Sequence, residues 1–259
     1  MSTRVLGRSG IKVSSIGFGC WAIGGPFTMD GTPDGWGAVD DRESAAAIRR
    51  ALDLGVTFFD TADAYGTGHS EQVLGRALAA HRDEVVIATK FGYTHDAGRR
   101  ALTGEDVSPG YIRQACQASL RRLGTDRIDL YQLHVSNLPA GQAGDVMGAL
   151  EDLVSDGLIR CYGWSTHDPE RAAAFAAGPH CAAVQHPLNV FADAPEILAI
   201  CEAHDLASGV LLTLARSFAS QMASISGASA NTFSGCWIAA QCGPAANAAA
   251  RSGWCVLHP

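Results

Sequence analysis

The 259-residue sequence lacks the features that would direct it to nucleic acid or into a membrane. It carries 19 Lys+Arg against 26 Asp+Glu, a formal charge of −7, and no lysine- or arginine-rich run. Nucleic acid and anionic membrane surfaces recruit proteins through a basic face, so neither is an expected partner. No segment approaches 18 uninterrupted apolar residues, and residues 1–15 lack the apolar core of a secretory signal. We therefore expect a cytoplasmic protein.

Cysteine and lysine are also sparse. The chain has eight cysteines and no C-x-x-C pair. Disulfide scaffolds need a higher cysteine density, whereas structural zinc sites and redox dithiols commonly use C-x-x-C. We therefore expect reduced thiols and no metal site. Lysine occurs only at Lys12 and Lys90.

Acidic residues and lysine disappear from the sequence after residue 206. Residues 207–259 contain no Asp, Glu or Lys, and their only charged residues are Arg216 and Arg251. Such a segment has neither the charged face of a surface helix nor the alternation of a strand. We interpret residues 1–206 as the folded domain and residues 207–259 as an atypical low-charge tail, such as an out-of-frame or truncated C-terminus. A pair of solvent-shielded helices is the alternative.

Short apolar runs alternate with amphipathic segments along the folded domain. The runs are continuous rather than alternating, which is typical of parallel strands buried on both faces. The predicted strands are Val13–Gly19, Val56–Asp60, Val85–Lys90, Ile128–His134, Ile159–Ser165 and Ala182–Pro187. The predicted helices are Asp41–Leu54, Ser70–Ala80, Ser108–Leu123, Ala143–Asp156, Pro169–Ala176 and Asp193–His204. Repeated strand–helix pairs indicate successive right-handed βαβ units, preceded by a small hairpin over Arg4–Val13.

Six βα units are compatible with a doubly wound sheet or with an eightfold barrel. Gly17–Ala22 formally fits the dinucleotide fingerprint G-x-G-x-x-A. The following Gly24-Gly25-Pro26 cannot open the helix that such a fingerprint requires, so we reject it. The predicted fold class is therefore α/β, a (β/α)8 TIM-barrel type with an N-terminal hairpin. Val210–Leu214 is a candidate seventh strand and no eighth is evident, so we expect an incomplete barrel with open edges.

Four polar side chains lie at or just beyond the carboxyl ends of predicted strands, where a βα barrel carries its chemistry: Asp60, Tyr65, Lys90 and His134. Burying the Lys90 ammonium is costly unless a carboxylate such as Asp60 neutralises it. Beside Tyr65 it would lower the pKa of the phenol and make it a better proton donor near neutral pH. With His134 polarising a carbonyl oxygen, the set predicts a proton-donating pocket for a carbonyl.

Each of these residues alone has a plainer explanation. Asp60 could cap a turn, Tyr65 could lie at a rim, Lys90 could be an ordinary ion-pair partner, and His134 could be a core histidine. Their joint placement after three consecutive strands favours the pocket.

Spaced motifs run through residues 4–206. They are Gly17–Trp21, Phe59-Asp60-Thr61-Ala62-x-x-Tyr65-Gly66, Ser70-Glu71, Leu74-Gly75-Arg76-Ala77-Leu78, Ala88-Thr89-Lys90, Ser119-Leu120-x-x-Leu123-x-Thr125-Asp126-x-Ile128-Asp129 and Gln132-Leu133-His134. Together they resemble the aldo-keto reductase family. The resemblance implies a barrel that binds NADPH without a Rossmann fold and reduces aldehydes or ketones. Tyr65 would be the general acid, Lys90 and Asp60 its tuning pair, and His134 the substrate-orienting residue.

The resemblance also implies a cofactor-binding set: Trp21, Asp60, Ser165, Thr166 and Gln185. Ser165 and Gln185 resemble residues that hydrogen-bond the nicotinamide carboxamide, and Trp21 resembles a residue lining the cleft. Thr166 stands where the family usually has Asn.

The family pattern ends near Leu206–Leu212, before the segments that would stack on the nicotinamide and bind the phosphates. Two alternatives to an active reductase therefore stay open: a non-catalytic nucleotide-binding or regulatory subunit, and an inactive truncated fragment. The complete proton-transfer set argues against the first alternative, and the charge-poor tail favours the second. The sequence leaves the substrate, the choice of NADPH over NADH and the oligomeric state open.

Overall fold

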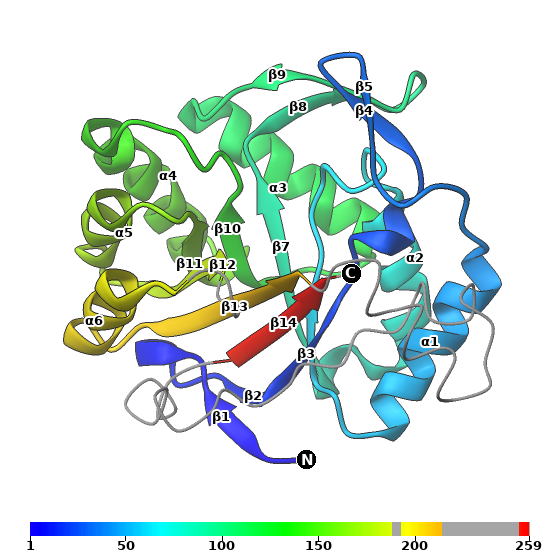
Figure 1. The fold of residues 1–259 in the computed structure, drawn as a ribbon, viewed down its shortest axis with the longest axis horizontal. Helices are drawn as coiled ribbons and strands as arrows, with labels where there is room; N and C mark the ends of the chain where they lie inside the picture. The colour runs from blue at the N-terminus through cyan, green and yellow to red at the C-terminus, as the bar shows by residue number, and fades with distance from the viewer. Residues whose placement is uncertain (188–192, 214–253, 259) are drawn as a thin grey trace.

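A computed structural model describes residues 1–187, 193–213 and 254–258. Its main feature is a closed barrel of parallel strands in the order β10-β11-β12-β13-β14-β3-β6-β7, with helices packed around it (Figure 1). This arrangement confirms the predicted barrel class. No helix in these residues is long and apolar enough to cross a membrane.

The predicted strand–helix units recur with shifted ends. The first six barrel strands in chain order are β3 (Ile16–Gly19), β6 (Phe58–Asp60), β7 (Val86–Phe91), β10 (Ile128–Leu133), β11 (Ile159–Ser165) and β12 (Cys181–Pro187). The helices are α1 (Asp41–Asp53), α2 (His69–Leu78), α3 (Pro109–Leu123), α4 (Ala143–Ser155), α5 (Pro169–Ala176) and α6 (Pro195–Ala203).

The expectation of an incomplete barrel is corrected by two further strands. β13 (Ala207–Thr213) pairs with β12, which confirms a seventh strand near the predicted place. β14 (Trp254–His258) is an eighth strand that the sequence did not reveal. It pairs with β13 over five residues and with β3 through Cys255 and Val256, so no open edge is left between β13 and β3. Residues 214–253 of the predicted tail lie outside the described residues, and the out-of-frame interpretation stays a prediction.

Local signals explain where the helices begin and end. At the start of α3, the Ser108 hydroxyl accepts a hydrogen bond from the Tyr111 amide, and Pro109 occupies the first turn. Gly124 then ends the helix with a φ of 65°, a left-handed conformation that favours glycine. Asp40 and Asp168 cap α1 and α5 in the same way as Ser108 caps α3.

The N-terminal hairpin closes the bottom of the barrel. Its strands β1 (Thr3–Val5) and β2 (Lys12–Ser14) are antiparallel, which confirms the predicted hairpin. Leu6 and Val13 of this segment belong to one apolar cluster with residues of the barrel strands, among them Phe58, Val86 and Leu130. A larger apolar cluster fills the layer between the strands and the helices. Five cysteines are buried and free: Cys20, Cys116, Cys161, Cys181 and Cys201.

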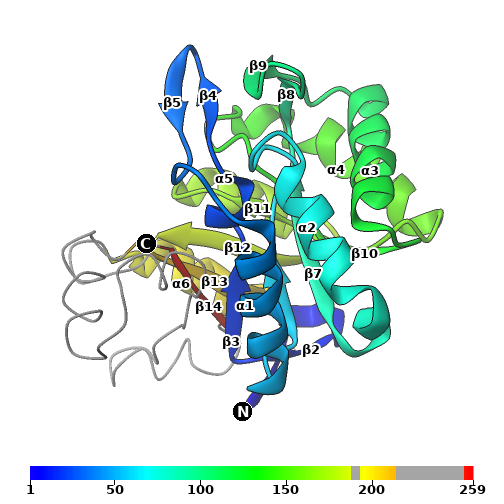
Figure 2. The same cartoon turned by 90° about the vertical axis from the view of Figure 1, so that its right-hand side faces the viewer.

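A four-stranded sheet, ordered β5-β4-β9-β8, stands at the opposite end of the molecule (Figure 2). β4 (Phe27–Met29) and β5 (Thr32–Asp34) come from the loop after β3, whereas β8 (Tyr93–Asp96) and β9 (Ala101–Glu105) come from the loop after β7. β4 and β9 join the two halves through the pairs Thr28↔Ala101 and Met29↔Leu102. This outer sheet was not predicted, because its strands are short and lack a continuous apolar run.

Candidate active site

Three neighbouring strands bring polar side chains together inside the barrel. Asp60 ends β6, Lys90 lies on β7, and Gln132 lies on β10. Their faces follow from the register: Asp60 pairs with Ala88, two residues before Lys90, and Lys90 pairs with Gln132. All three side chains are fully buried. A carboxylate, an ammonium and an amide therefore meet in a site with little access to water.

The Lys90 ammonium is the centre of this group. It donates hydrogen bonds to Asp60 Oδ2 at 2.7 Å, to the Thr61 carbonyl at 3.0 Å and to the Tyr65 hydroxyl oxygen at 3.1 Å. Gln132 donates to the other Asp60 oxygen at 3.2 Å. Because the Tyr65 oxygen accepts from Lys90, its own proton is left to point toward another acceptor. The arrangement is that of a phenol held ready to donate its proton.

The expected lowering of the Tyr65 pKa is corrected by the structure. Burial raises the pKa of Tyr65 to about 12, and the positive charge of Lys90 offsets this rise only in part. Burial also opposes the charge on Lys90, but Asp60 and Tyr65 outweigh it and raise the pKa of the ammonium above its usual value. The chain alone therefore holds a neutral phenol beside a firmly protonated lysine.

Aromatic rings flank Tyr65 on two sides. Trp21 stacks on the Tyr65 ring with centroids 6.2 Å apart, and Trp36 meets Trp21 edge-on at 5.5 Å. On the other side His134 meets Tyr65 edge-on at 5.7 Å, and Tyr93 meets His134 at 5.3 Å. The structure thus brings Asp60, Lys90, Tyr65 and His134 together, as the sequence predicted. Trp36 follows β5 and Tyr93 begins β8, so both loops that build the outer sheet contribute a ring to the site.

The expected carboxamide-binding residues lie on the next two strands of the barrel. Ser165 of β11 and Gln185 of β12 are register partners, and Thr166 donates its backbone N–H to the Gln185 carbonyl at 2.9 Å. Ser165 lies two residues after Gly163, the register partner of Gln132, so it shares the inner face with the Lys90 group. The Gln185 side chain is fully buried, and neither its Nε2 nor its Oε1 has a partner in the described part of the chain.

Such an orphaned amide offers the N–H donors of its NH2 group and its carbonyl oxygen acceptor to a ligand that enters the barrel. The Thr166 hydroxyl points elsewhere: it donates to the Ser136 carbonyl at 3.3 Å and accepts from the Asp168 amide at 3.2 Å. Among the expected cofactor residues, Gln185 therefore has free hydrogen-bonding capacity, whereas the hydroxyl of Thr166 is already engaged.

Three residues of the site were not singled out from the sequence: Gln132, Trp36 and Tyr93. Gln132 lies on β10 and precedes His134, the first residue after that strand, by two positions. This period of two is a usable signal that Gln132 faces the barrel interior with the site. Trp36 and Tyr93 lie outside the barrel strands, where spacing gives no information about which face a side chain joins. In the described residues no group of three His, Cys, Asp or Glu side chains could hold a metal ion.

A second buried polar group lies behind the Tyr65 segment. Glu71 of α2 accepts hydrogen bonds from Thr89 at 2.6 Å and from the Arg122 guanidinium of α3 at 2.5 Å. Asp63 is also buried, and neither of its carboxylate oxygens has a partner in the described part of the chain. Burial and the nearby Glu71 carboxylate raise the pKa of Asp63 well above its usual range, although Arg122 acts against them. Burial therefore favours the neutral form of Asp63 over the carboxylate.

Asp63→Asn should stabilise the protein at neutral and alkaline pH. A carboxyl whose pKa is raised in the folded state contributes stability below its unfolded pKa, near 4, and loses it as pH rises toward the folded pKa. The amide in the Asp63→Asn variant has nearly the same shape and does not ionise, so it loses no stability as pH rises. Urea unfolding should show nearly equal stability at pH 4 and an advantage for the variant that grows by up to about 1.4 kcal/mol per pH unit above it. The exposed Asp152→Asn is the control. A pH-independent difference would contradict a raised pKa for Asp63 in the folded protein.

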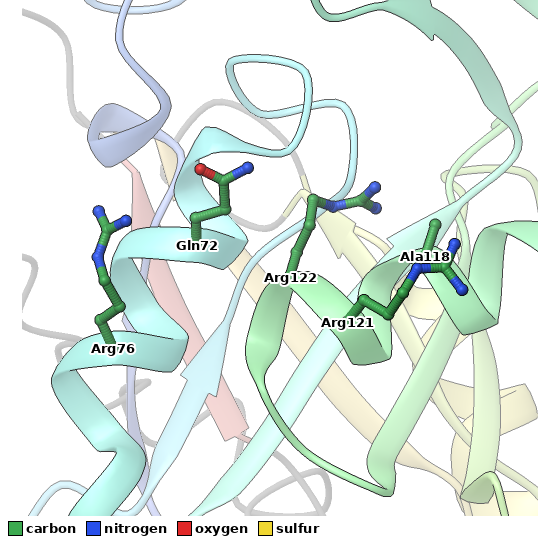
Figure 3. Close-up of a pocket in the computed structure, with 5 residues that line it drawn as sticks. All are labelled: Gln72, Arg76, Ala118, Arg121 and Arg122. Carbon is green, nitrogen blue, oxygen red and sulfur yellow. The ribbon is translucent and has the colours of Figure 1, made fainter.

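A groove of about 370 Å³ lies on the outside of the barrel between α2 and α3. Gln72 and Arg76 of α2 line one wall, and Ala118, Arg121 and Arg122 of α3 line the other (Figure 3). The Arg76 and Arg121 guanidinium groups lie at opposite sides of it (Figure 3). None of the proton-transfer residues lines this groove, so it is separate from the candidate active site.

Comparison with known proteins agrees with this geometry. The profile of the Aldo/keto reductase family matches residues 15–232, which extends beyond the expected limit near residue 206. The chain is 38% identical over 187 residues to Aldo-keto reductase YhdN of Bacillus subtilis. It is 30% identical over 207 residues to Uncharacterized oxidoreductase YqkF of the same organism. These alignments cover 71% and 80% of this chain but only 52% and 62% of the two relatives.

Solved structures give the same result. The holo form of aldo-keto reductase AKR11C1 from Bacillus halodurans is 31% identical, with a TM-score of 0.70 over 82% of this chain and 66% of that one. An aldo/keto reductase from Klebsiella pneumoniae, in complex with NADP and acetate, is 28% identical, with a TM-score of 0.67 over 89% of this chain and 79% of that one. Taken with the match to most of the sequence, these similarities show that the chain belongs to the aldo/keto reductase family.

Proposed function

We propose that this protein is an oxidoreductase that reduces the carbonyl group of an aldehyde or ketone, with NADPH as cofactor and Tyr65 as general acid. The observation that carries the proposal is the Lys90 ammonium, which bonds Asp60 at 2.7 Å and Tyr65 at 3.1 Å at once. Membership in the aldo/keto reductase family supports the proposal. The relatives are longer than the segment over which this chain matches them.

The four polar residues have complementary tasks in this reaction. Tyr65 gives its proton to the carbonyl oxygen as negative charge develops there. The Lys90 ammonium stabilises the resulting phenolate, while Asp60 keeps Lys90 charged inside the barrel. The His134 ring lies edge-on to Tyr65, where it orients the carbonyl oxygen toward the phenol. The burial of Asp60 and Lys90 strengthens each of these interactions.

The inner face of β11 and β12 fits the nicotinamide part of the cofactor. The unpaired Gln185 amide and the neighbouring Ser165 are the residues proposed to hold its carboxamide, and Trp21 and Asp60 the residues proposed to line the same cleft. When bound, the nicotinamide supplies the hydride. A crystal complex in which a relative holds NADP supports the choice of cofactor. We further propose a cytoplasmic location and small-molecule carbonyl substrates, with no nucleic-acid partner.

The proposal is tested by titrating the purified chain with NADPH, followed by tryptophan fluorescence, and by assaying NADPH oxidation with a panel of aldehydes and ketones. Saturable binding with carbonyl-dependent turnover supports a reductase. Saturable binding without turnover favours a non-catalytic nucleotide-binding subunit. No binding by a folded chain favours an inactive fragment.

Gln185→Leu should weaken NADPH binding about 5- to 100-fold, because it removes two hydrogen-bonding atoms and leaves the carboxamide unpaired when bound. Tyr65→Phe, in contrast, should lower turnover without weakening NADPH binding. Fluorescence titration measures the dissociation constant, and Gln142→Leu, in the 3-10 turn before α4, is the matched control. Equal affinity of Gln185→Leu and the parent protein would exclude Gln185 from the cofactor site.

A further inference from the structure

Arg100 lies at the turn between β8 and β9 and reaches back to the loop after β3. Its Nε donates to the Pro26 carbonyl at 2.8 Å and its Nη2 donates to the Gly24 carbonyl at 2.5 Å. Its own carbonyl accepts a hydrogen bond from the Thr28 amide at 2.9 Å. One residue therefore bonds three backbone positions of a different loop. Its backbone has a φ of 50°, a left-handed conformation that is uncommon for a residue other than glycine.

The guanidinium lies where the loop after β3 touches the Tyr65 segment. Gly24 packs so closely on this segment that a Cβ at Gly24 would lie 2.6 Å from the Tyr65 carbonyl carbon. A Cβ at Gly66 would collide with the Gly24 carbonyl and would lie 2.9 Å from Arg100 Nη2. Two glycines thus allow the backbones to meet, and the guanidinium covers their contact.

This contact connects Arg100 to the proposed proton donor by a short path. The backbone next to Tyr65 rests on Gly24, and the Tyr65 ring stacks on Trp21, which begins the short turn ending at Gly24. A guanidinium is suited to this position because its planar fork bonds two carbonyls in fixed directions, whereas a lysine ammonium has no such fork.

We propose that Arg100 is a positioning residue: it fastens the outer sheet and the loop after β3 onto the Tyr65 segment, and so fixes the phenol relative to Trp21. Its effect on turnover rests on the proposed function, whereas its effect on the order of residues 65–70 does not. Arg100 acts through backbone contacts and touches neither Lys90 nor Asp60 in the described structure.

The test compares Arg100→Ala, Arg100→Lys and Arg99→Ala. Arg99 is the matched control, because it is exposed and forms an ion pair with Asp96 at 3.6 Å. Hydrogen exchange is followed by mass spectrometry in peptides that cover residues 62–70, with peptides from α4 as an internal reference. The amides of Tyr65, His69 and Ser70 are hydrogen-bonded to backbone carbonyls and therefore report on this segment.

We expect Arg100→Ala to speed exchange in residues 62–70 by about 10-fold or more and to lower kcat by about 10- to 100-fold, since a small misplacement of a reacting group is costly. The KM for NADPH and exchange in α4 should stay near the parent values. Arg100→Lys should be intermediate, millimolar guanidinium ion should partly restore Arg100→Ala, and Arg99→Ala should resemble the parent protein.

Unchanged exchange in residues 62–70 of a folded Arg100→Ala protein would overturn the proposal. If Arg100→Ala does not fold, Arg100→Lys decides by the same exchange measurement. If the parent protein has no reductase activity, the proposed function fails, and the exchange experiment still decides whether Arg100 orders the Tyr65 segment.

Discussion

Tyr65→Phe should lower kcat for carbonyl reduction by about 10²- to 10⁴-fold, the usual contribution of a positioned general acid. The substitution removes one oxygen, the atom to which Lys90 donates at 3.1 Å. It keeps the ring that stacks on Trp21 and meets His134 edge-on. The loss should therefore fall on proton transfer and leave the packing of the site in place.

Steady-state assays of NADPH oxidation measure this effect, and fluorescence titration checks that NADPH affinity changes little. Tyr93→Phe is the matched control, because Tyr93 also packs on His134 but its hydroxyl is outside the Lys90 group. A Tyr65→Phe protein that reduces aldehydes at the parent rate would show that the proton comes from elsewhere.

The pH dependence of the parent protein follows from the same phenol. Reduction needs Tyr65 protonated, and its pKa is raised to about 12 by burial. The rate should therefore hold steady through neutral and mildly alkaline pH and decline only as pH approaches that value. A decline centred near neutral pH would instead mean that bound cofactor or substrate lowers the pKa of Tyr65. The sequence alone had assigned that effect to Lys90.

Much of the fold and the central part of the site could be predicted from the sequence. Continuous apolar runs separated by amphipathic segments are enough to indicate parallel strands and covering helices. The barrel topology then brings the strand ends together, which is why Asp60, Lys90 and His134 gather around Tyr65 although they are far apart in the chain.

The remaining features depend on tertiary packing, which spacing does not encode. β14 lies far along the chain from β13, in a segment without the charge pattern that frames the other units, and is defined by its pairing with β3 and β13. Trp36 and Tyr93 join the site from segments near the outer sheet, which no periodic pattern marks. The predicted direction of the Tyr65 pKa shift was wrong, because the sequence indicates which charged residue lies beside Tyr65 but not how deeply the phenol is buried.

Asp60→Ala should destabilise the protein by about 3–5 kcal/mol, because it leaves the Lys90 ammonium buried without its counter-ion. Both side chains are fully buried, and their atoms are 2.7 Å apart, so water cannot take over the role of the carboxylate. Urea unfolding at neutral pH measures the change. Asp83→Ala, which breaks the surface pair with Arg127 at 2.7 Å, should have little effect.

The double variant Asp60→Ala, Lys90→Met separates two contributions to stability. One is the cost of leaving the Lys90 ammonium buried without a counter-ion, and the other is the net contribution of the Asp60–Lys90 ion pair. Methionine keeps the length and apolar volume of the lysine stem without its charge, so the double variant should recover most of the stability that Asp60→Ala loses. It should have no reductase activity, because Tyr65 would face neither a cation nor a carboxylate. Stability and turnover would thus respond in opposite directions to the second substitution. A double variant as unstable as Asp60→Ala would mean that Asp60 supports the barrel through Gln132 or its own backbone rather than through Lys90.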